Sequence, residues 1–176
     1  MIIRISETDD IPEMNRIMNE AIASLMTPFL APEQIEASYE FMGLDTQLVE
    51  DKTYFICEAA GDIIGCGGWS RRATLFGGDH TVGRDSEFLD PAKDAARVRA
   101  MYTDPKHVRR GVGRRILDAC EQAARKEGFL RAELAATLAG EPLYRKCGYR
   151  PIKEFVATSS TGVDVPLILM GKPLAQ

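Results

Sequence analysis

Two glycines flanked by arginines stand between a strand-like segment and a helix-like segment of this chain. The stretch runs from Arg109 to Arg115 with the sequence RRGVGRR; a strand pattern precedes it at 98–103 and a helical period follows it at 116–127. The first amide groups of a helix have no partner inside the helix, and the helix dipole attracts an anion to them. Glycine lets a ligand approach the backbone closely, and arginine adds positive charge. The spacing therefore predicts a cradle for a pyrophosphate group.

Size and composition indicate a globular protein. The chain has 176 residues, of which 45% are hydrophobic and 27% are charged, so we expect one domain that spans residues 1–176. The formal charge of −4 and the pI of about 5.3 argue against general nucleic-acid binding, which needs a broad basic face. The arginine cluster is a local exception, as a small anionic ligand requires.

Cysteine usage and hydropathy predict a cytoplasmic protein without a metal site or a membrane partner. None of the four cysteines forms a C-x-x-C pair, and Cys57, Cys66 and Cys120 lie in apolar patterns, where a free thiol packs as a small hydrophobe. The N-terminus lacks the long apolar core of a signal peptide. No apolar run approaches the roughly 20 residues that span a bilayer. The two histidines stand in no ligand motif.

The periodicity predicts the element order β-α-α-β-β-β-α-β-α-β-β. Strands are expected at 2–6, 53–59, 62–69, 98–103, 130–136, 149–157 and 163–170, and helices at 11–25, 32–50, 116–127 and 141–146. Gly61-Asp62 is a hairpin turn signal, while the strand–helix–strand unit around the arginine-rich turn should be parallel and right-handed. The expected fold class is α/β (α+β), a mixed sheet of about seven strands with helices on both faces.

Smaller features add three expectations. Glu121 and Arg125 have the spacing of an exposed ion pair on one helix face. Leu130, Ala132 and Leu134 alternate as the inward face of a strand. The segment 71–95 has no clear period, and a loop of this length is more often functional than idle.

This order, together with two motifs, resembles the GNAT superfamily of acetyl-CoA-dependent N-acyltransferases over nearly the whole chain. The stretch from Arg99 to Arg114 is similar to the family's strand, turn and pyrophosphate loop, and Pro142 to Tyr149 is similar to its "FYxxxGF" segment. Two positions depart from the pattern. Val108 stands where the loop usually begins with Gln or Arg, and Thr137 replaces an asparagine that often contacts the pantetheine arm.

The resemblance implies an N-acetyltransferase that uses acetyl-CoA as co-substrate, with direct attack by a primary amine. Backbone amides of the loop would bind the pyrophosphate, and a bulge would splay two parallel strands so that main-chain groups pair with the pantetheine arm. Tyr144 would protonate the departing thiolate, because a phenol with a pKa of about 10 is a general acid when it lies within hydrogen-bond reach. The expected donor-binding residues are Met101, Tyr102, Thr103, Val108, Arg109, Arg110, Gly111, Val112, Gly113 and Arg114.

The general base and the acceptor stay open at this point. Glu133, Asp79, His80 and Glu87 are candidates for the base, and the sequence favours none of them. The acceptor is expected to be a small-molecule or peptide amine: an amino acid, a polyamine, an antibiotic or a protein N-terminus. The donor is acetyl-CoA or a longer acyl-CoA. The exposed edge of the last hairpin permits a homodimer.

Two other function classes compete with the enzyme. A non-catalytic acyl-CoA-binding or regulatory module would bind the donor without acetyl transfer. An interaction protein would dock an acidic partner or RNA on the arginine-rich helix end, although the acidic overall charge opposes this. A lone glycine pair is more often only a tight turn, but the flanking arginines and the downstream tyrosine segment favour a ligand site. The glycine spacings of the P-loop and of the Rossmann motif are absent, which argues against these two nucleotide sites.

Overall fold

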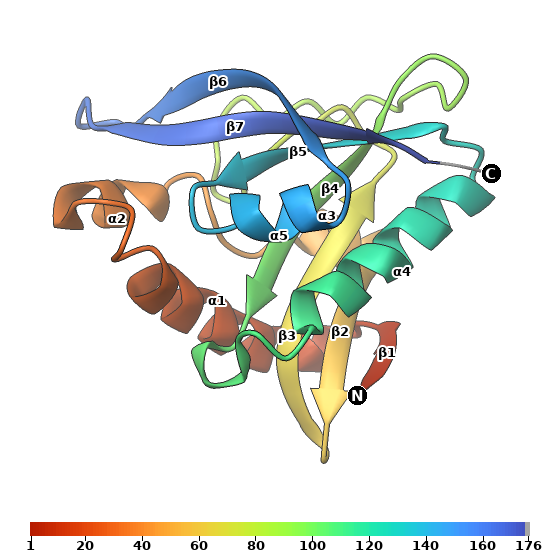
Figure 1. Cartoon of the computed structure of the whole chain (residues 1–176), viewed down its shortest axis with the longest axis horizontal. Helices are drawn as coiled ribbons and strands as arrows, with labels where there is room; N and C mark the ends of the chain where they lie inside the picture. Colours follow the sequence, from red (N-terminus) through yellow and green to blue (C-terminus); the bar gives the residue numbers. More distant parts are fainter. Residues whose placement is uncertain (175–176) are drawn as a thin grey trace.

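A seven-stranded sheet in the order β1-β2-β3-β4-β5-β7-β6 lies at the centre of the structure, a computed structural model that describes residues 1–174 (Figure 1). The strands are β1 (Ile2–Ile5), β2 (Tyr54–Ala59), β3 (Asp62–Ser70), β4 (Ala96–Thr103), β5 (Arg131–Thr137), β6 (Arg150–Thr158) and β7 (Asp164–Pro173). The α-helices are α1 (Ile11–Leu25), α2 (Pro32–Ser38), α3 (Thr46–Glu50), α4 (Val112–Lys126) and α5 (Glu141–Lys146). Short 3-10 turns cover Thr8–Asp10 and Pro105–His107.

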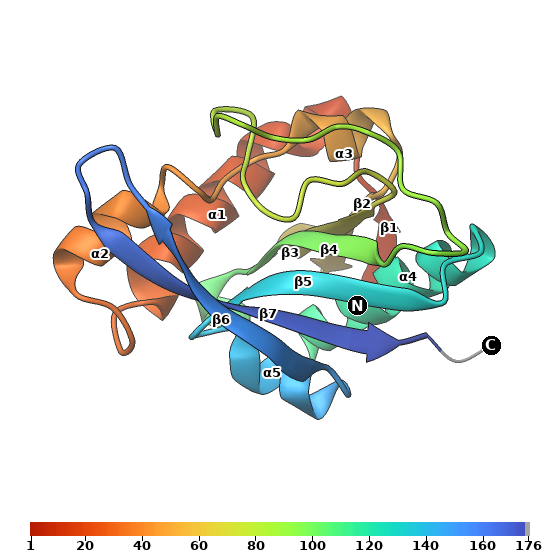
Figure 2. The ribbon, with the colours of Figure 1, turned by 90° about the horizontal axis from the view of Figure 1, so that it is seen from above.

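Helices cover both faces of the sheet, with α1, α2 and α3 on one side and α4 and α5 on the other (Figure 2). Apolar residues recur with the helical period in α1 and α4, so each helix buries one stripe against the strands. Neighbouring strands pair antiparallel except β4 and β5, which are parallel and joined through α4. The predicted fold class and the parallel strand–helix–strand unit are therefore confirmed.

Glycines in β3 let α4 pack directly on the sheet. A Cβ at Gly65 would lie 2.6 Å from a methyl of Val112, and one at Gly67 would lie 2.8 Å from a methyl of Ile116 and 2.2 Å from the sulfur of Met101. Contacts this short are sterically excluded, so both positions require the absence of a side chain. The glycines thus let the first turns of α4 and the side chain of Met101 on β4 lie close to the backbone of β3.

Two details of the expected local structure are wrong. The region expected to be helical at 32–50 contains two short helices, α2 and α3, because the chain leaves the helix at 39–45, where Gly43 has φ +139°. The predicted hairpin between β2 and β3 is confirmed, but it turns at Ala60 and Gly61, with φ +54° and +93°, one residue before the expected Gly61-Asp62 pair. A two-residue turn with positive φ at both positions matches the twist of the strands.

The tertiary structure also changes two burial expectations. Glu121 is buried, at 3% exposure, and binds both Arg125 at 3.1 Å and Lys172 at 2.8 Å. The sequence pattern showed only the first partner, since Lys172 comes from the distant strand β7. Leu130 precedes β5 and is 48% exposed, so the inward face of β5 is made by Ala132, Leu134 and Ala136. Among the described residues, no helix has the length and hydropathy to cross a bilayer.

Candidate functional site

The parallel strands β4 and β5 separate soon after they pair. Their register joins Ala96 to Ala132 and Arg97 to Glu133, and no later pair follows, although both strands continue for several residues. The rest of β5 pairs only with β7, out to Thr137 and Leu167. The sheet is therefore open between the C-terminal halves of β4 and β5, and the backbone groups that face this gap have no strand partner across it.

A β-bulge in β4 accompanies this separation. Cys66 pairs with Tyr102 but Gly68 pairs with Arg99, so β4 has one residue more than β3 over this interval. Ala100 has φ +51°, a conformation that non-glycine residues rarely adopt. The buried Tyr54 hydroxyl donates a hydrogen bond of 3.1 Å to the Ala100 carbonyl and helps to hold the bulge in place.

The arginine-rich turn presents a run of backbone amides at the start of α4. Gly111 is the N-cap residue of α4, with φ +83°, and Arg109 also has positive φ at +63°. Within residues 1–174, the amide groups of residues 108–114 donate to no protein acceptor, and the first amide of this segment that does so is Arg115, which bonds the Gly111 carbonyl. Of the two glycines in this motif, only Gly111 forms part of the turn, because Gly113 already lies in α4. A Cβ at Gly113 would meet Leu143 of α5 at 2.7 Å.

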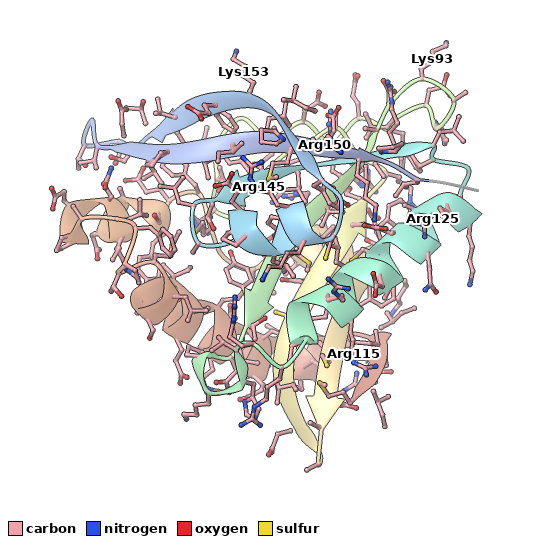
Figure 3. The ribbon with its side chains drawn as sticks, in the orientation of Figure 1. Lys93, Arg115, Arg125, Arg145, Arg150 and Lys153 are labelled. Atoms are coloured by element: carbon pink, nitrogen blue, oxygen red, sulfur yellow. The ribbon has the colours of Figure 1, made fainter. Side chains whose placement is uncertain are left out.

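The arginines of this turn are not neutralised within the described chain. Arg109, Arg110, Arg114 and Arg115 are exposed, and none forms an ion pair with a described carboxylate. Figure 3 shows Arg115 at the first turns of α4, with Arg125 further along the same helix. The amide run, the helix dipole and the unpaired guanidinium groups together make this end of α4 a strongly positive site for an anion.

A cavity of about 720 Å³ connects the turn to the gap between the strands. Its cationic lining consists of Arg99, Arg109, Arg114 and Lys146. Its hydroxyl-bearing lining consists of Ser38, Tyr102, Thr103, Thr137 and Tyr144. The remaining lining is apolar or glycine, and among the described residues no carboxylate or imidazole lines the cavity. Of the residues expected to bind the donor, all line this cavity except Arg110, which lies beside it on the surface.

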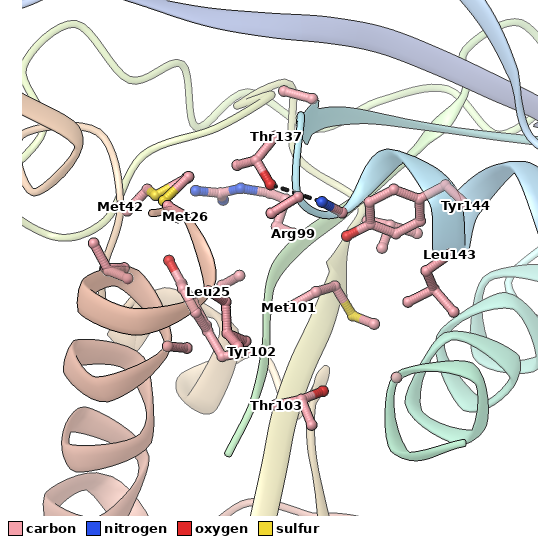
Figure 4. A pocket seen from close by; sticks show the side chains of 18 of the residues that line it. Leu25, Met26, Met42, Arg99, Met101, Tyr102, Thr103, Thr137, Leu143 and Tyr144 are labelled. Atoms are coloured by element: carbon pink, nitrogen blue, oxygen red, sulfur yellow. Dashed lines mark hydrogen bonds between the residues drawn. The ribbon is translucent and has the colours of Figure 1, made fainter. Parts of the chain in front are cut away.

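Tyr144 points into the cavity from α5 (Figure 4). Its ring is held edge-on against Tyr149, with 6.0 Å between the ring centroids, and its hydroxyl bonds no described residue. Burial raises the pKa of the Tyr144 hydroxyl above its ordinary value of 10.0. The group therefore keeps its proton through neutral and mildly alkaline pH and is free to donate it to a ligand atom.

Arg99 is a cavity residue whose role the sequence pattern did not reveal. It lies on β4 at 4% exposure; its Nη1 is 2.6 Å from Asp45, and its Nη2 donates to the Gly77 carbonyl at 2.6 Å. Burial lowers the pKa of the Arg99 guanidinium, although an arginine stays charged. An arginine in the middle of a buried strand pattern was the available signal, but its partner Asp45 stands 54 positions earlier in the chain.

The side chains proposed as the general base lie outside the cavity. Glu133 pairs with Arg97, and Asp79 accepts hydrogen bonds from Thr46 at 2.9 and 3.0 Å. His80 bonds the Tyr39 carbonyl at 2.5 Å, and Glu87 is exposed in the loop 71–95. None of the four is therefore placed to take a proton from a bound amine directly.

Thiol and metal chemistry have no arrangement to support them among the described residues. Cys57, Cys66 and Cys120 are buried and free, and burial raises the pKa of the Cys66 thiol to about 12. A thiol with such a pKa is a poor nucleophile at neutral pH. In residues 1–174, no group of three or more His, Cys, Asp or Glu side chains could hold a metal ion.

Thr137, which stands in place of the family's asparagine, lines the cavity, and its hydroxyl accepts a hydrogen bond from the Gly140 amide at 3.1 Å.

Several solved structures share this fold. A GCN5-related N-acetyltransferase from Rhodopseudomonas palustris is 19% identical, with a TM-score of 0.72 over 98% of this chain and 95% of that one. A ribosomal-protein-alanine N-acetyltransferase from Brucella melitensis is 16% identical, with a TM-score of 0.66 over 99% and 100%. The PaiA N-acetyltransferase from Thermoplasma acidophilum, in complex with coenzyme A, is 14% identical, with a TM-score of 0.62 over 98% of each.

The family assignment comes from the sequence itself. No curated protein sequence matches the chain significantly. The model of the acetyltransferase (GNAT) domain matches residues 50–151. This range includes the bulged strand β4, the arginine-rich turn, the start of α4, the diverging strand β5 and the tyrosine of α5, all of which contribute residues to the cavity. The chain therefore belongs to the GNAT family of acetyltransferases.

Proposed function

We propose that this chain is an acetyl-CoA-dependent N-acetyltransferase, with residues 1–176 forming one catalytic domain. The observation that carries the proposal is the coincidence, in one cavity, of an unbonded amide run at a helix N-terminus and an open edge on β4. A pyrophosphate linked to an extended arm with amide groups is complementary to both. The PaiA structure in complex with coenzyme A shows that this fold accommodates such a ligand.

The donor fits these residues as follows. The amides of residues 108–114 bind the pyrophosphate, and Arg109 and Arg114 offset its charge from the cavity rim. Arg110, on the surface beside the cavity, contributes only to the surrounding positive field. The main chain of Met101–Thr103, beyond the bulge, pairs with the amides of the pantetheine arm as a further strand would. Backbone recognition of this kind explains why Val108 replaces a polar residue without loss of the site.

The proposed reaction takes place in the cavity beside Tyr144. The amine nitrogen attacks the thioester carbonyl carbon, the carbon–sulfur bond breaks, and the departing thiolate receives a proton from the Tyr144 hydroxyl. The amine attacks in its neutral form, and the N–H proton that the nitrogen loses as the amide forms passes to solvent water. Tyr144 suits this role because its hydroxyl bonds none of residues 1–174 and keeps its proton at working pH.

Calorimetric titration with acetyl-CoA and with CoA tests the first level of the proposal. We expect both ligands to bind and to raise the melting temperature. If neither binds, the enzymatic proposal fails. A thiol-release assay with a panel of amines tests the second level. Donor binding without thiol release from any amine would instead support a non-catalytic acyl-CoA-binding module. This module is the second candidate because no carboxylate or imidazole of the described residues lines the cavity.

A further inference from the structure

One half of the cavity is walled by apolar side chains, and we call it the acceptor chamber. Figure 4 shows Leu25, Met26 and Met42 on the side of β4 opposite to Leu143 and Tyr144. The lining side chains that define the chamber are Leu25, Met26, Phe41, Met42, Phe76 and Val165. They come from α1, the segment after α2, the loop 71–95 and β7. The donor half contains the arginine-rich turn, so the chamber is where the acceptor would bind.

The charged group of the chamber is Arg99. Each of its terminal nitrogens carries two N–H groups, and the described contacts use one of each pair, to Asp45 at Nη1 and to the Gly77 carbonyl at Nη2. The Asp45 carboxylate is shared, because it lies 2.6 Å from Arg99 and 2.7 Å from Arg84. The next carboxylate, Asp79, is 3.6 Å from Arg84 and hydrogen-bonded elsewhere. Arg99 is thus a fixed, buried cation with spare donor capacity at the end of an apolar chamber.

The chamber also restricts the basicity of the acceptor. No carboxylate or imidazole among residues 1–174 lines the cavity, so an ammonium group would find no side chain to take its proton. The α-amine of a peptide has an ordinary pKa of about 7.7–8.0 and a lysine side chain about 10.4. At pH 7 the neutral fractions are about 10% and about 0.04%, a difference of roughly 300-fold. At pH 7 a weakly basic amine is therefore in its neutral, nucleophilic form far more often than a lysine side chain is.

We propose that the acceptor is an α-amine next to an amide carbonyl, as at a peptide N-terminus, that carries an apolar side chain, with the carbonyl bound by Arg99; this inference rests on the proposed acetyl transfer. The apolar side chain fills the chamber between α1 and Phe76, and the oxygen next to the amine accepts from the guanidinium. The amine then lies at the boundary with the donor half. Polyamines are excluded, because their further ammonium groups would be desolvated beside Arg99 without a carboxylate to pair with.

A panel of defined amines tests this inference on the unmodified protein. With saturating acetyl-CoA at pH 7, thiol release is measured for L-leucinamide, L-leucine, a tripeptide that begins with leucine, Nα-acetyl-L-lysine amide and spermidine. We expect kcat/KM for leucinamide to exceed that for the blocked lysine by about 100-fold or more. The tripeptide should react like leucinamide, whereas L-leucine, whose carboxylate makes the α-amine more basic, should react more slowly than both.

The outcomes separate the inference from the proposed function. If acetyl-CoA binds by calorimetry but spermidine or the blocked lysine reacts faster than every α-amine, or no α-amine reacts, the inference is overturned while donor binding stands. If acetyl-CoA does not bind, the proposed function fails. A pH profile adds a second readout: kcat/KM for leucinamide should rise until the pKa of the amine itself. A plateau well below that pKa would reveal a base and contradict the inference.

Variants of two arginines on β4 test the contact with the acceptor. Arg99→Met should raise KM for leucinamide about 10-fold or more, while the Kd for acetyl-CoA stays within about 2-fold of wild type. The KM of Arg99→Lys should lie between those of the wild type and Arg99→Met. Arg97→Met is the matched control, because Arg97 also forms an ion pair, with Glu133, but does not line the cavity. An equal effect of Arg97→Met and Arg99→Met on KM would remove Arg99 from acceptor recognition.

Discussion

Substitution of Gly111 is the sharpest test of the pyrophosphate site. Gly111 has φ +83°, and a Cβ placed on it meets no protein atom within 4 Å. A side chain there would project into the cavity space that the phosphates are proposed to occupy, without disturbing the protein around it. Gly111→Val therefore combines two effects, which are backbone strain from the positive φ and obstruction of the ligand.

A second glycine separates these two effects. Gly162, in the turn between β6 and β7, has φ +81° and likewise has open space around its Cβ, but it does not line the cavity. Strain in this region of φ costs about 1–2 kcal/mol in either variant. For a chain of this size each kcal/mol lowers the melting temperature by roughly 2–4 °C. Gly111→Val and Gly162→Val should therefore melt at similar, slightly reduced temperatures.

Only Gly111→Val should weaken donor binding. Displacing the pyrophosphate from one backbone amide removes a charge-assisted hydrogen bond worth about 1.5–3 kcal/mol, which corresponds to a rise of roughly 10- to 150-fold in the Kd for acetyl-CoA. Calorimetric titration of the two variants and the wild type measures this difference. If Gly111→Val binds acetyl-CoA as tightly as Gly162→Val does, the turn before α4 is not the pyrophosphate site.

Three further perturbations address catalysis, packing and pH. Tyr144→Phe should lower kcat about 100-fold while the Kd for acetyl-CoA changes less than about 2-fold; an unchanged kcat would remove Tyr144 from the mechanism. Gly67→Ala should destabilise the fold by about 1–3 kcal/mol in urea denaturation, because its Cβ would overlap the side chain of Met101. Unchanged stability would show that Met101 and the strand move apart without an energetic cost. The guanidinium of Arg72 holds the pKa of Asp51 below its ordinary value of 3.8, so this pair stabilises the fold above about pH 4 and the contribution disappears as the pH falls. Asp51→Asn should therefore melt below wild type at pH 6 and approach it near pH 3, and a constant gap across this range would contradict the assignment.

The sequence predicted the donor half of the cavity better than the acceptor half. The arginine-rich turn, the bulged strand and Tyr144 are contiguous or close in the chain, so their local patterns carried the information. The acceptor chamber instead combines side chains from α1, from the loop after α2 and from β7. Their apolar character is the same whether they line a cavity or fill a core. Arg99 went unrecognised for a similar reason, since its partner Asp45 is distant in sequence.

Hydrophobic periodicity, turn residues and two short motifs, all properties of short windows, predicted the sheet class, the family and the element order, except that the helix expected at 32–50 is two helices. Three features were decided only in three dimensions: the separation of β4 from β5, the burial of Glu121 beside Lys172, and a cavity to whose lining the described residues contribute no carboxylate. Each depends on which distant segments meet when the sheet closes and the helices pack on it. Local periodicity shows that a residue faces inward, but only the packed structure shows what it faces.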